Sequence, residues 1–94
     1  MSDSKTTRIV EISNVEGLHA RAAIAIAALL RRFDAEVLLS KNSERVKATD
    51  VLQILSLGAG PGERLLLEAT GREAVVALDA LTRLIAQNFN EAPP

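Results

Sequence analysis

The residues with the clearest chemical potential are His19 and Arg21, which lie in the segment Gly17-Leu18-His19-Ala20-Arg21. His19 is the chain's single histidine, and strong helix formers follow it, so we expect it at the start of a helix. A helix N-terminus carries a partial positive charge and unsatisfied backbone N–H groups, which favour a neutral imidazole and attract oxyanions. A neutral imidazole can attack phosphorus, and a guanidinium can pair with phosphoryl oxygens. The segment therefore predicts a phosphoryl-accepting histidine.

The alternative for each residue is structural. A single histidine without context is more often a surface or helix-capping residue than a nucleophile, and an arginine on a helix is most often a solvated charge. The two-residue offset between His19 and Arg21 favours the chemical interpretation. Without cysteine, one histidine does not form a usual zinc site, so we expect no metal site, no cofactor and no enzymatic activity of its own.

Composition narrows the class of protein. A length of 94 residues suits one domain, and 48% hydrophobic residues, nearly all aliphatic, argue for a packed core. A net charge of -1 and only two aromatic residues argue against nucleic acid as a partner. The longest apolar run, residues 22–30, is too short to span a membrane, and residues 1–7 do not resemble a secretory signal. The absence of cysteine suits a reducing compartment, and we expect a cytoplasmic protein. We also expect it to be a monomer.

The strand signals are short segments of β-branched and alternating apolar residues. In the last of them, apolar residues alternate with Arg64 and Glu68, which predicts one sheet face in contact with water. Turn residues around Asn42-Ser43 predict that the second and third strands form an antiparallel hairpin. The four predicted strands are residues 8–13, 35–40, 45–48 and 63–69.

Three helices are predicted from periodicity and capping residues. The first covers Ala20–Phe33, with Ile24, Ala27 and Leu30 in register. The second is short, running to about Leu57, with Asp50 as its N-cap and Gln53 reaching back three residues later. The third begins at a capping box over residues 70–73. Its apolar residues, at spacings of three and four, are Ala74, Leu78, Leu81, Ile85 and Phe89.

The element order is strand, helix, strand, strand, helix, strand, helix. With one polar sheet face, the helices must cover the other face only. We therefore predict an α+β fold, an open-faced β-sandwich with a four-stranded antiparallel sheet and three helices on one face. The ordered part is expected to span about residues 8–89, with flexible tails over 1–7 and 90–94.

Three segments together resemble HPr, the histidine-containing phosphocarrier family of the phosphoenolpyruvate-dependent sugar phosphotransferase system. They are Gly17–Arg21, Ser56-Leu57-Gly58-Ala59 after the short helix, and Gly62-Glu63 at the last strand. The resemblance implies that His19 accepts a phosphoryl group on Nδ1, as pros-phosphohistidine, from enzyme I and passes it to an enzyme IIA component. It also implies that Arg21 helps to hold the phosphoryl group. Such a protein is a substrate of enzymes and not itself an enzyme.

The resemblance also implies a partner-binding face formed by Ala20 and by Val51, Leu52 and Leu55 of the short helix. The last three residues lie at i, i+1 and i+4, so they can share one face. The structural alternative is burial against the sheet, and we expect at least one of the three to pack inward.

Three positions depart from the family pattern. Ala22 stands where the family usually has proline, and Glu16 stands where many relatives have asparagine, which places a carboxylate near the predicted site. Asp50 occupies the position of a serine that a dedicated kinase phosphorylates in many relatives. We interpret Asp50 as an ordinary N-cap, with permanent mimicry of phosphoserine as the alternative, since one carboxylate carries less charge than a phosphate.

The first functional hypothesis is a cytoplasmic phosphocarrier that acts in sugar transport. The second is a regulatory phosphoprotein of a nitrogen-related phosphotransferase branch, which docks to signalling proteins. The third is an interaction domain that is never phosphorylated, in which His19 only caps a helix. Incubation with phosphoenolpyruvate and enzyme I separates the third hypothesis from the other two.

Overall fold

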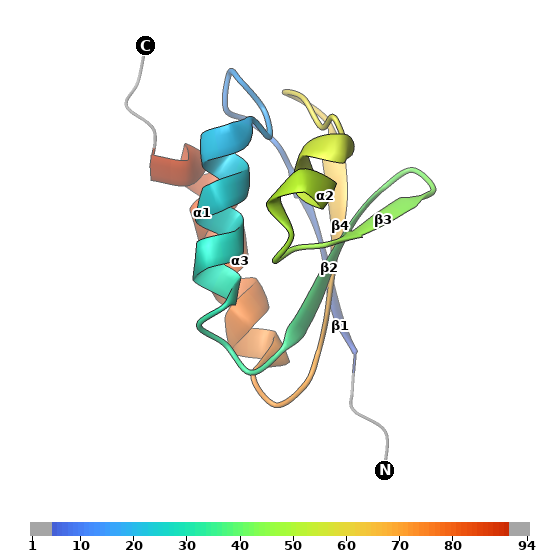
Figure 1. The fold of residues 1–94 in the computed structure, drawn as a ribbon, viewed down its shortest axis with the longest axis vertical. Helices are drawn as coiled ribbons and strands as arrows, with labels where there is room; N and C mark the ends of the chain where they lie inside the picture. Colours follow the sequence, from blue (N-terminus) through green and yellow to red (C-terminus); the bar gives the residue numbers. More distant parts are fainter. Residues whose placement is uncertain (1–4, 91–94) are drawn as a thin grey trace.

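The computed structural model describes residues 5–90, and Figure 1 shows a twisted sheet with helices on one side of it. The strands pair antiparallel in the order β1-β4-β2-β3, so β1 and β3 are the edges. The predicted element order and fold class are confirmed. The strands are β1 (Thr6–Glu11), β2 (Glu36–Lys41), β3 (Glu44–Lys47) and β4 (Arg64–Thr70). The helices are α1 (Ala20–Leu30), α2 (Val51–Ser56) and α3 (Ala74–Ala86), followed by a 3-10 turn, η1 (Asn88–Asn90).

The ends of the chain differ in part from the prediction. β1 begins at Thr6, two residues before the predicted strand, so residues 6 and 7 belong to the sheet. Asn90 likewise belongs to η1. The remainder of the predicted tails, residues 1–4 and 91–94, lies outside the described residues. Between residues 5 and 90, none of the helices has the length and apolar character needed to cross a bilayer.

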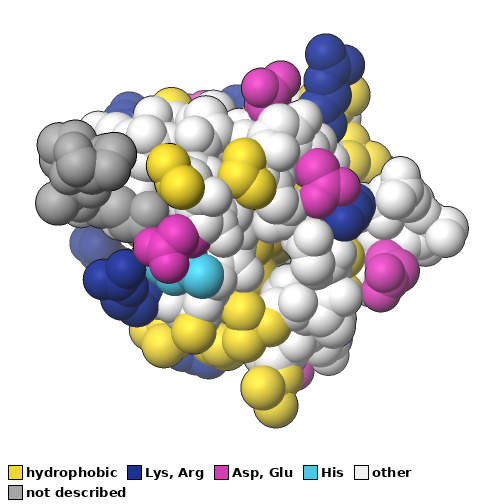
Figure 2. Space-filling view, turned by 90° about the horizontal axis from the view of Figure 1, so that it is seen from above, with side chains coloured by type: hydrophobic (Ala, Val, Ile, Leu, Met, Phe, Trp, Pro, Cys, Tyr) yellow, Lys and Arg dark blue, Asp and Glu magenta, His cyan; other side chains and the backbone are white. Residues whose placement is uncertain are grey.

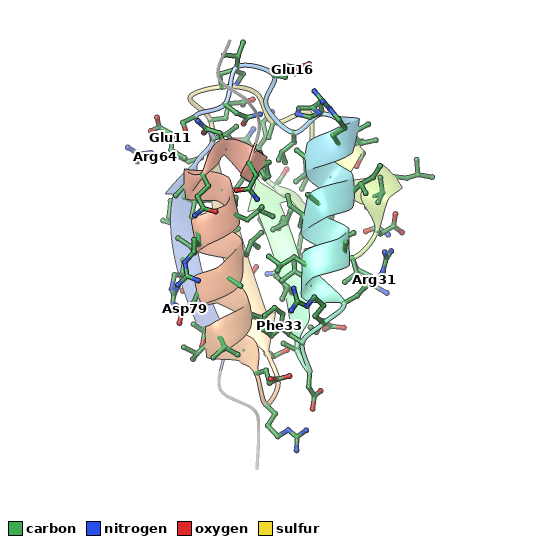
Figure 3. The ribbon with its side chains drawn as sticks, turned by 90° about the vertical axis from the view of Figure 1, so that its left-hand side faces the viewer. Glu11, Glu16, Arg31, Phe33, Arg64 and Asp79 are labelled. Carbon is green, nitrogen blue, oxygen red and sulfur yellow. The ribbon has the colours of Figure 1, made fainter. Side chains whose placement is uncertain are left out.

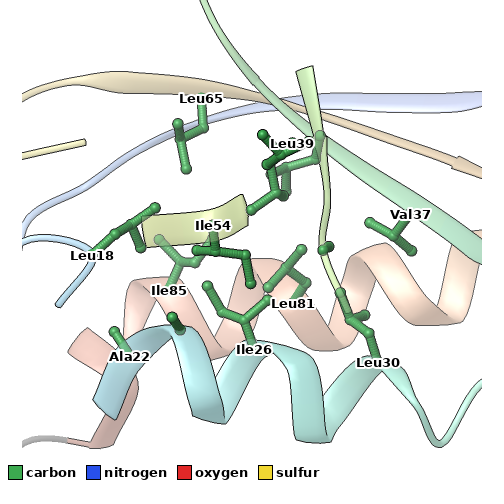
Figure 4. Packing of buried hydrophobic residues seen from close by; sticks show 14 of the residues in the cluster. Leu18, Ala22, Ile26, Leu30, Val37, Leu39, Ile54, Leu65, Leu81 and Ile85 are labelled. Carbon is green, nitrogen blue, oxygen red and sulfur yellow. The ribbon is translucent and has the colours of Figure 1, made fainter. Parts of the chain in front are cut away.

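A mainly aliphatic set of large side chains fills the space between the sheet and the helices. α1 and α3 lie side by side over the sheet, and Figure 4 shows their side chains meeting those of β2 and β4. Leu18, immediately before His19, is buried in this cluster, so the core holds the residue that leads into α1. The largest fully buried side chains are Ile12, Ile26, Leu30, Leu39, Ile54, Leu65, Leu67, Leu78 and Leu81.

α1 ends at Leu30, three residues before its predicted end, and the predicted apolar register is wrong at one position. Ile24 is 55% exposed and points away from the core. The physical reason is the alanine content of this helix, which places apolar residues on every face, so periodicity does not select the buried one. The buried stripe is Ala22, Ala23, Ile26, Ala27 and Leu30.

On the sheet face that the helices leave uncovered, Glu68 is less exposed to solvent than predicted. Its side chain is only 6% exposed, because Lys5 and Arg45, each 3.1 Å from a carboxylate oxygen, lie beside it. A hydrogen bond from Lys5, and after it the charge of Arg45, hold the pKa of Glu68 below its usual value despite burial. The predicted alternation along β4 is correct, but long cationic side chains cover the carboxylate.

The predicted capping box before α3 is wrong. The N-cap of α3 is Glu73, and its carboxylate accepts a hydrogen bond from the Asp34 backbone N–H at 2.7 Å instead of from the first turn of α3. This bond ties the start of α3 to the turn after α1. At the other end, Phe89 has a left-handed backbone with φ of 58° and is buried from η1, beyond the regular helix. α3 is therefore shorter than its apolar series predicts.

Candidate functional site

His19 is the N-cap residue of α1. Its backbone is extended, and its Nδ1 accepts a hydrogen bond from the Arg21 backbone N–H at 3.2 Å. An acceptor nitrogen presents a lone pair, so Nδ1 faces the positive end of the helix as an unprotonated atom. The ring is half-buried, and Figure 2 shows it at the molecular surface beside an acidic side chain. The predicted position of His19 at a helix start is confirmed.

The turn before His19 is locked by a close backbone approach. Gly17 has φ of 65°, and a Cβ on this residue would lie 2.6 Å from the Ala59 carbonyl oxygen, so only glycine fits here. The buried Asn14 closes the turn by donating from its amide to the Gly17 carbonyl at 2.8 Å. The Leu18 backbone N–H then donates to the Ala59 carbonyl at 2.9 Å. The segment that carries His19 is therefore fixed against the loop that follows α2.

Lys41 and Glu63 organise that loop in turn. The Lys41 ammonium donates to the carbonyls of Leu57 and Gly58, at 3.3 and 3.2 Å, and lies 2.9 Å from the Glu63 carboxylate. The same carboxylate accepts from the Gly60 backbone N–H at 2.7 Å. This bond first, and then Lys41, keep the pKa of Glu63 below its usual value. We did not predict these roles of Lys41 and Glu63, because sequence alone places neither the two side chains beside each other nor the backbone atoms that they bind.

Arg21 pairs with Glu16 in this structure. One guanidinium nitrogen lies 3.5 Å from a Glu16 carboxylate oxygen, and both side chains are exposed. An exposed pair at this distance contributes little stability and is easily exchanged for another anion. Figure 3 shows Glu16 in the turn at one end of the molecule and Arg31 at the opposite end of α1. Within the described residues, no group of three or more His, Cys, Asp or Glu side chains is arranged to hold a metal ion.

Comparison with known proteins identifies the family. Residues 6–87 match the family model for the PTS HPr component phosphorylation site. The chain belongs to the HPr family. It is 40% identical over 89 residues to phosphocarrier protein NPr of Shewanella violacea, covering 95% of this chain and 98% of that protein. It is 34% identical to phosphocarrier protein HPr of Treponema pallidum, covering 89% and 96%.

Solved HPr structures have the same fold. The HPr structure from Thermoanaerobacter tengcongensis superposes with a TM-score of 0.89 at 32% identity, covering 94% of this chain and 99% of that one. HPr from Bacillus anthracis gives 0.84 at 29% identity, covering 87% and 98%. A dimer of HPr from T. tengcongensis is also similar, with a TM-score of 0.74 at 34% identity and coverage of 87% and 94%. The expected monomer therefore stays a prediction for this HPr-family member.

The hydrophobic residues predicted to bind partners differ in exposure. Leu52 is 78% exposed, whereas Val51 and Leu55 are half-buried and pack against the core, so the three do not form one equally open face. Ala20 is exposed at the first position of α1. Ile24, which we assigned to the core, is a further exposed hydrophobic residue on α1. Figure 2 shows hydrophobic side chains exposed on the same face of this HPr-family protein as the imidazole.

Asp50 is the N-cap of α2, as predicted. Its Oδ1 accepts from the Gln53 backbone N–H at 3.1 Å, and its Oδ2 accepts from the Gln53 side-chain amide at 3.2 Å. The Gln53 amide oxygen in turn accepts from the Lys47 backbone N–H at 2.9 Å. Both carboxylate oxygens thus take part in the cap. The structure accounts for Asp50 as a helix cap without reference to a phosphoserine.

Proposed function

We propose that this HPr-family protein is a cytoplasmic phosphocarrier in which Nδ1 of His19 accepts a phosphoryl group from enzyme I and passes it to an enzyme IIA component. The observation that carries the proposal is the position of Nδ1, 3.2 Å from a backbone N–H at the N-terminus of α1. A nitrogen lone pair at this point is a nucleophile beside donors that can stabilise the incoming oxygens.

In the transfer step, the Nδ1 lone pair forms a bond to phosphorus while the bond between phosphorus and the donor group of enzyme I breaks. The donor group keeps that electron pair. The Nε2 proton of His19 can then leave to solvent, so that a neutral ring carries the phosphoryl group. Positioning and charge neutralisation supply most of the catalysis in such a transfer.

Two donors from one residue serve the phosphoryl oxygens. The Arg21 backbone N–H, which Nδ1 occupies in this structure, becomes available to a phosphoryl oxygen once Nδ1 is bonded to phosphorus. The Arg21 guanidinium can leave Glu16 and pair with a second oxygen, because its contact with Glu16 is long and exposed. Release to the next acceptor reverses both exchanges. Neither exchange requires a change in the fold.

For the pathway, we propose the nitrogen-related branch in place of the sugar branch of the first hypothesis. The proteins named NPr from Shewanella violacea, Klebsiella oxytoca and Escherichia coli are each 40% identical to this chain. The proteins named HPr from Treponema pallidum, Cupriavidus necator and Neisseria meningitidis are 34–38% identical. Asp50 stands where many relatives have the serine that a dedicated kinase phosphorylates. This difference also fits a carrier that the kinase does not regulate.

The test is phosphorylation with labelled phosphoenolpyruvate and two purified donors in parallel, enzyme I of the sugar branch and enzyme I of the nitrogen-related branch. We expect one acid-labile, base-stable phosphate per chain, on Nδ1 by heteronuclear NMR, and faster labelling by the nitrogen-related donor. His19→Ala is the control. Labelling of that variant, or no labelling of the native protein by either donor, contradicts the carrier function. Faster labelling by the sugar-branch donor contradicts only the choice of pathway.

A further inference from the structure

The loop between α2 and β4 is the support on which the His19 segment rests. The backbone of this loop meets the turn before His19 at Ala59, whose carbonyl accepts the Leu18 N–H at 2.9 Å. Gly17 passes so close to Ala59 that a single added carbon would clash with it. A shift of Ala59 must therefore move Leu18, and with it the N-cap of α1.

Two charged side chains hold the loop on either side of Ala59. Before it, the Lys41 ammonium binds the carbonyl of Gly58 at 3.2 Å. After it, the Glu63 carboxylate binds the N–H of Gly60 at 2.7 Å. The two side chains are joined to each other at 2.9 Å, and the Lys41 side chain is only 19% exposed. The Glu63 side chain is 40% exposed, so only the Lys41 end of the pair is sheltered, but a pair that also binds backbone is held more firmly than a pair between two exposed side chains.

The sequence of the loop explains why an external clamp is needed. It contains Gly58, Gly60, Pro61 and Gly62, and glycines give a chain wide conformational freedom. Gly58 and Gly62 adopt left-handed backbone angles, φ of 61° and 86°. α2 ends directly before the loop, so its last carbonyls also need donors, and Lys41 supplies one.

We propose that Lys41 and Glu63 are positioning residues for His19, which act by fixing the Ala59 carbonyl and through it the Leu18 N–H and the N-cap of α1. The proposal rests on the carrier function proposed above for its effect on transfer, while its structural part stands without it. Loss of the clamp loosens the geometry of Nδ1 against the incoming phosphorus and lowers the rate of transfer.

The test compares Lys41→Met and Glu63→Gln with the native protein. Lys41→Met removes the ammonium and keeps much of its aliphatic bulk, while Glu63→Gln keeps an oxygen for the Gly60 N–H and removes the charge. Arg8→Met is the matched control, because Arg8 also forms an ion pair between two elements, with Asp79 at 2.6 Å. Figure 3 shows Asp79 on α3, away from the turn that carries Glu16. Lys41→Arg tests rescue by a retained cation.

The first measurement is amide hydrogen exchange of Leu18 by NMR, which needs no phosphoryl donor. We expect exchange to be about tenfold faster in Lys41→Met, because charged hydrogen bonds to the loop are lost. A smaller increase is expected in Glu63→Gln, near-native exchange in Lys41→Arg, and no change in Arg8→Met. The second measurement is transfer from enzyme I, where we expect a kcat about ten- to a hundredfold lower at an unchanged KM in Lys41→Met.

Native Leu18 exchange and native kcat in both Lys41→Met and Glu63→Gln overturn the proposal. The proposal is also overturned if Arg8→Met loses as much kcat as Lys41→Met for the same fall in melting temperature. That result would mean that Lys41 and Glu63 contribute only to general stability. If the native protein takes no label from either donor, the carrier function fails, and the exchange of Leu18 still decides whether Lys41 and Glu63 hold the His19 segment.

Discussion

The N-termini of α1 and α2 are both capped by a side chain, and the two caps differ in chemistry. At α1, one neutral nitrogen of His19 accepts one backbone N–H at 3.2 Å. At α2, the Asp50 carboxylate uses both oxygens, and its partner Gln53 is held in turn by the Lys47 backbone. In the proposed transfer step, a phosphoryl oxygen replaces Nδ1 at the cap of α1, while the cap of α2 already holds the Asp50 carboxylate. Under the proposed function, the N-terminus of a helix therefore holds a reactive nitrogen in α1 and a permanent charge in α2.

Among the substitutions that test the difference between the two caps, removal of the imidazole is expected to have the largest effect. We expect His19→Ala to abolish phosphoryl acceptance and to cost about 1 kcal/mol of unfolding free energy, because the cap is lost together with the proposed nucleophile. His19→Asn separates the two roles, since asparagine restores an acceptor for the Arg21 N–H and offers no nucleophile. Labelling from phosphoenolpyruvate and urea unfolding measure the two effects. If His19→Asn accepts phosphate, the nucleophile lies elsewhere.

Leu52 is expected to give the next largest effect, and it tests whether α2 binds partner proteins. Leu52→Glu places a charge on a highly exposed hydrophobic position, so we expect binding to enzyme I to weaken about ten- to a hundredfold with little change in stability. Ile9→Glu is the matched control, because Ile9 is 70% exposed on the uncovered sheet face. Calorimetric titration measures the affinity. Equal weakening by both variants, or loss of cooperative unfolding in Leu52→Glu, contradicts a docking role for Leu52.

Arg21→Ala separates the role of the guanidinium from that of the helix N-terminus. It removes the guanidinium and keeps the Arg21 backbone N–H, which donates to His19 Nδ1. We expect transfer about tenfold slower but not abolished, since one charged donor to the phosphoryl group is lost and the helix N–H groups remain. Arg83→Ala, on the exposed side of α3, is the control. Rapid-quench measurement of the phosphorylation rate reports the effect. An unchanged rate in Arg21→Ala makes Arg21 a surface charge.

Much of the fold follows from local signals in the sequence. β-branched residues and alternation locate the four strands within two residues, and Asp50 with Gln53 locates the start of α2. The errors arise where tertiary contacts override a local pattern. Glu73 follows the capping-box pattern, yet its carboxylate binds the Asp34 backbone, which lies 39 residues away in the chain. Glu68 follows the pattern of a solvated residue, yet two distant cations cover it.

The position of His19 at a helix start was predictable from the sequence, and the contacts that hold its segment in place were not. His19 lies at the start of α1 because the composition of the following segment favours a helix, which is local information. Gly17 needs its left-handed backbone and its lack of a side chain because Ala59 lies against it, and that contact joins loops 42 residues apart in numbering. Lys41 belongs to no motif, and Gly62-Glu63 indicates the family but not the role of Glu63, since both side chains bind carbonyl or N–H groups that any residue supplies.

Asp50 offers the smallest expected effect and decides what the fixed charge on α2 does. Asp50→Ala should lower the unfolding free energy by about 1 kcal/mol, and Asp50→Ser should recover most of that loss, because serine keeps an oxygen for the Gln53 N–H. If Asp50 is only a cap, as its bonds to Gln53 indicate, the association rate of Asp50→Ser with enzyme I equals that of the native protein at every ionic strength. A charge that repels acidic groups of enzyme I predicts instead that Asp50→Ser associates faster, most of all at low salt where screening is weak. Stopped-flow association rates over a salt series distinguish the two, and a rate increase at low salt in the serine variant contradicts the purely structural role.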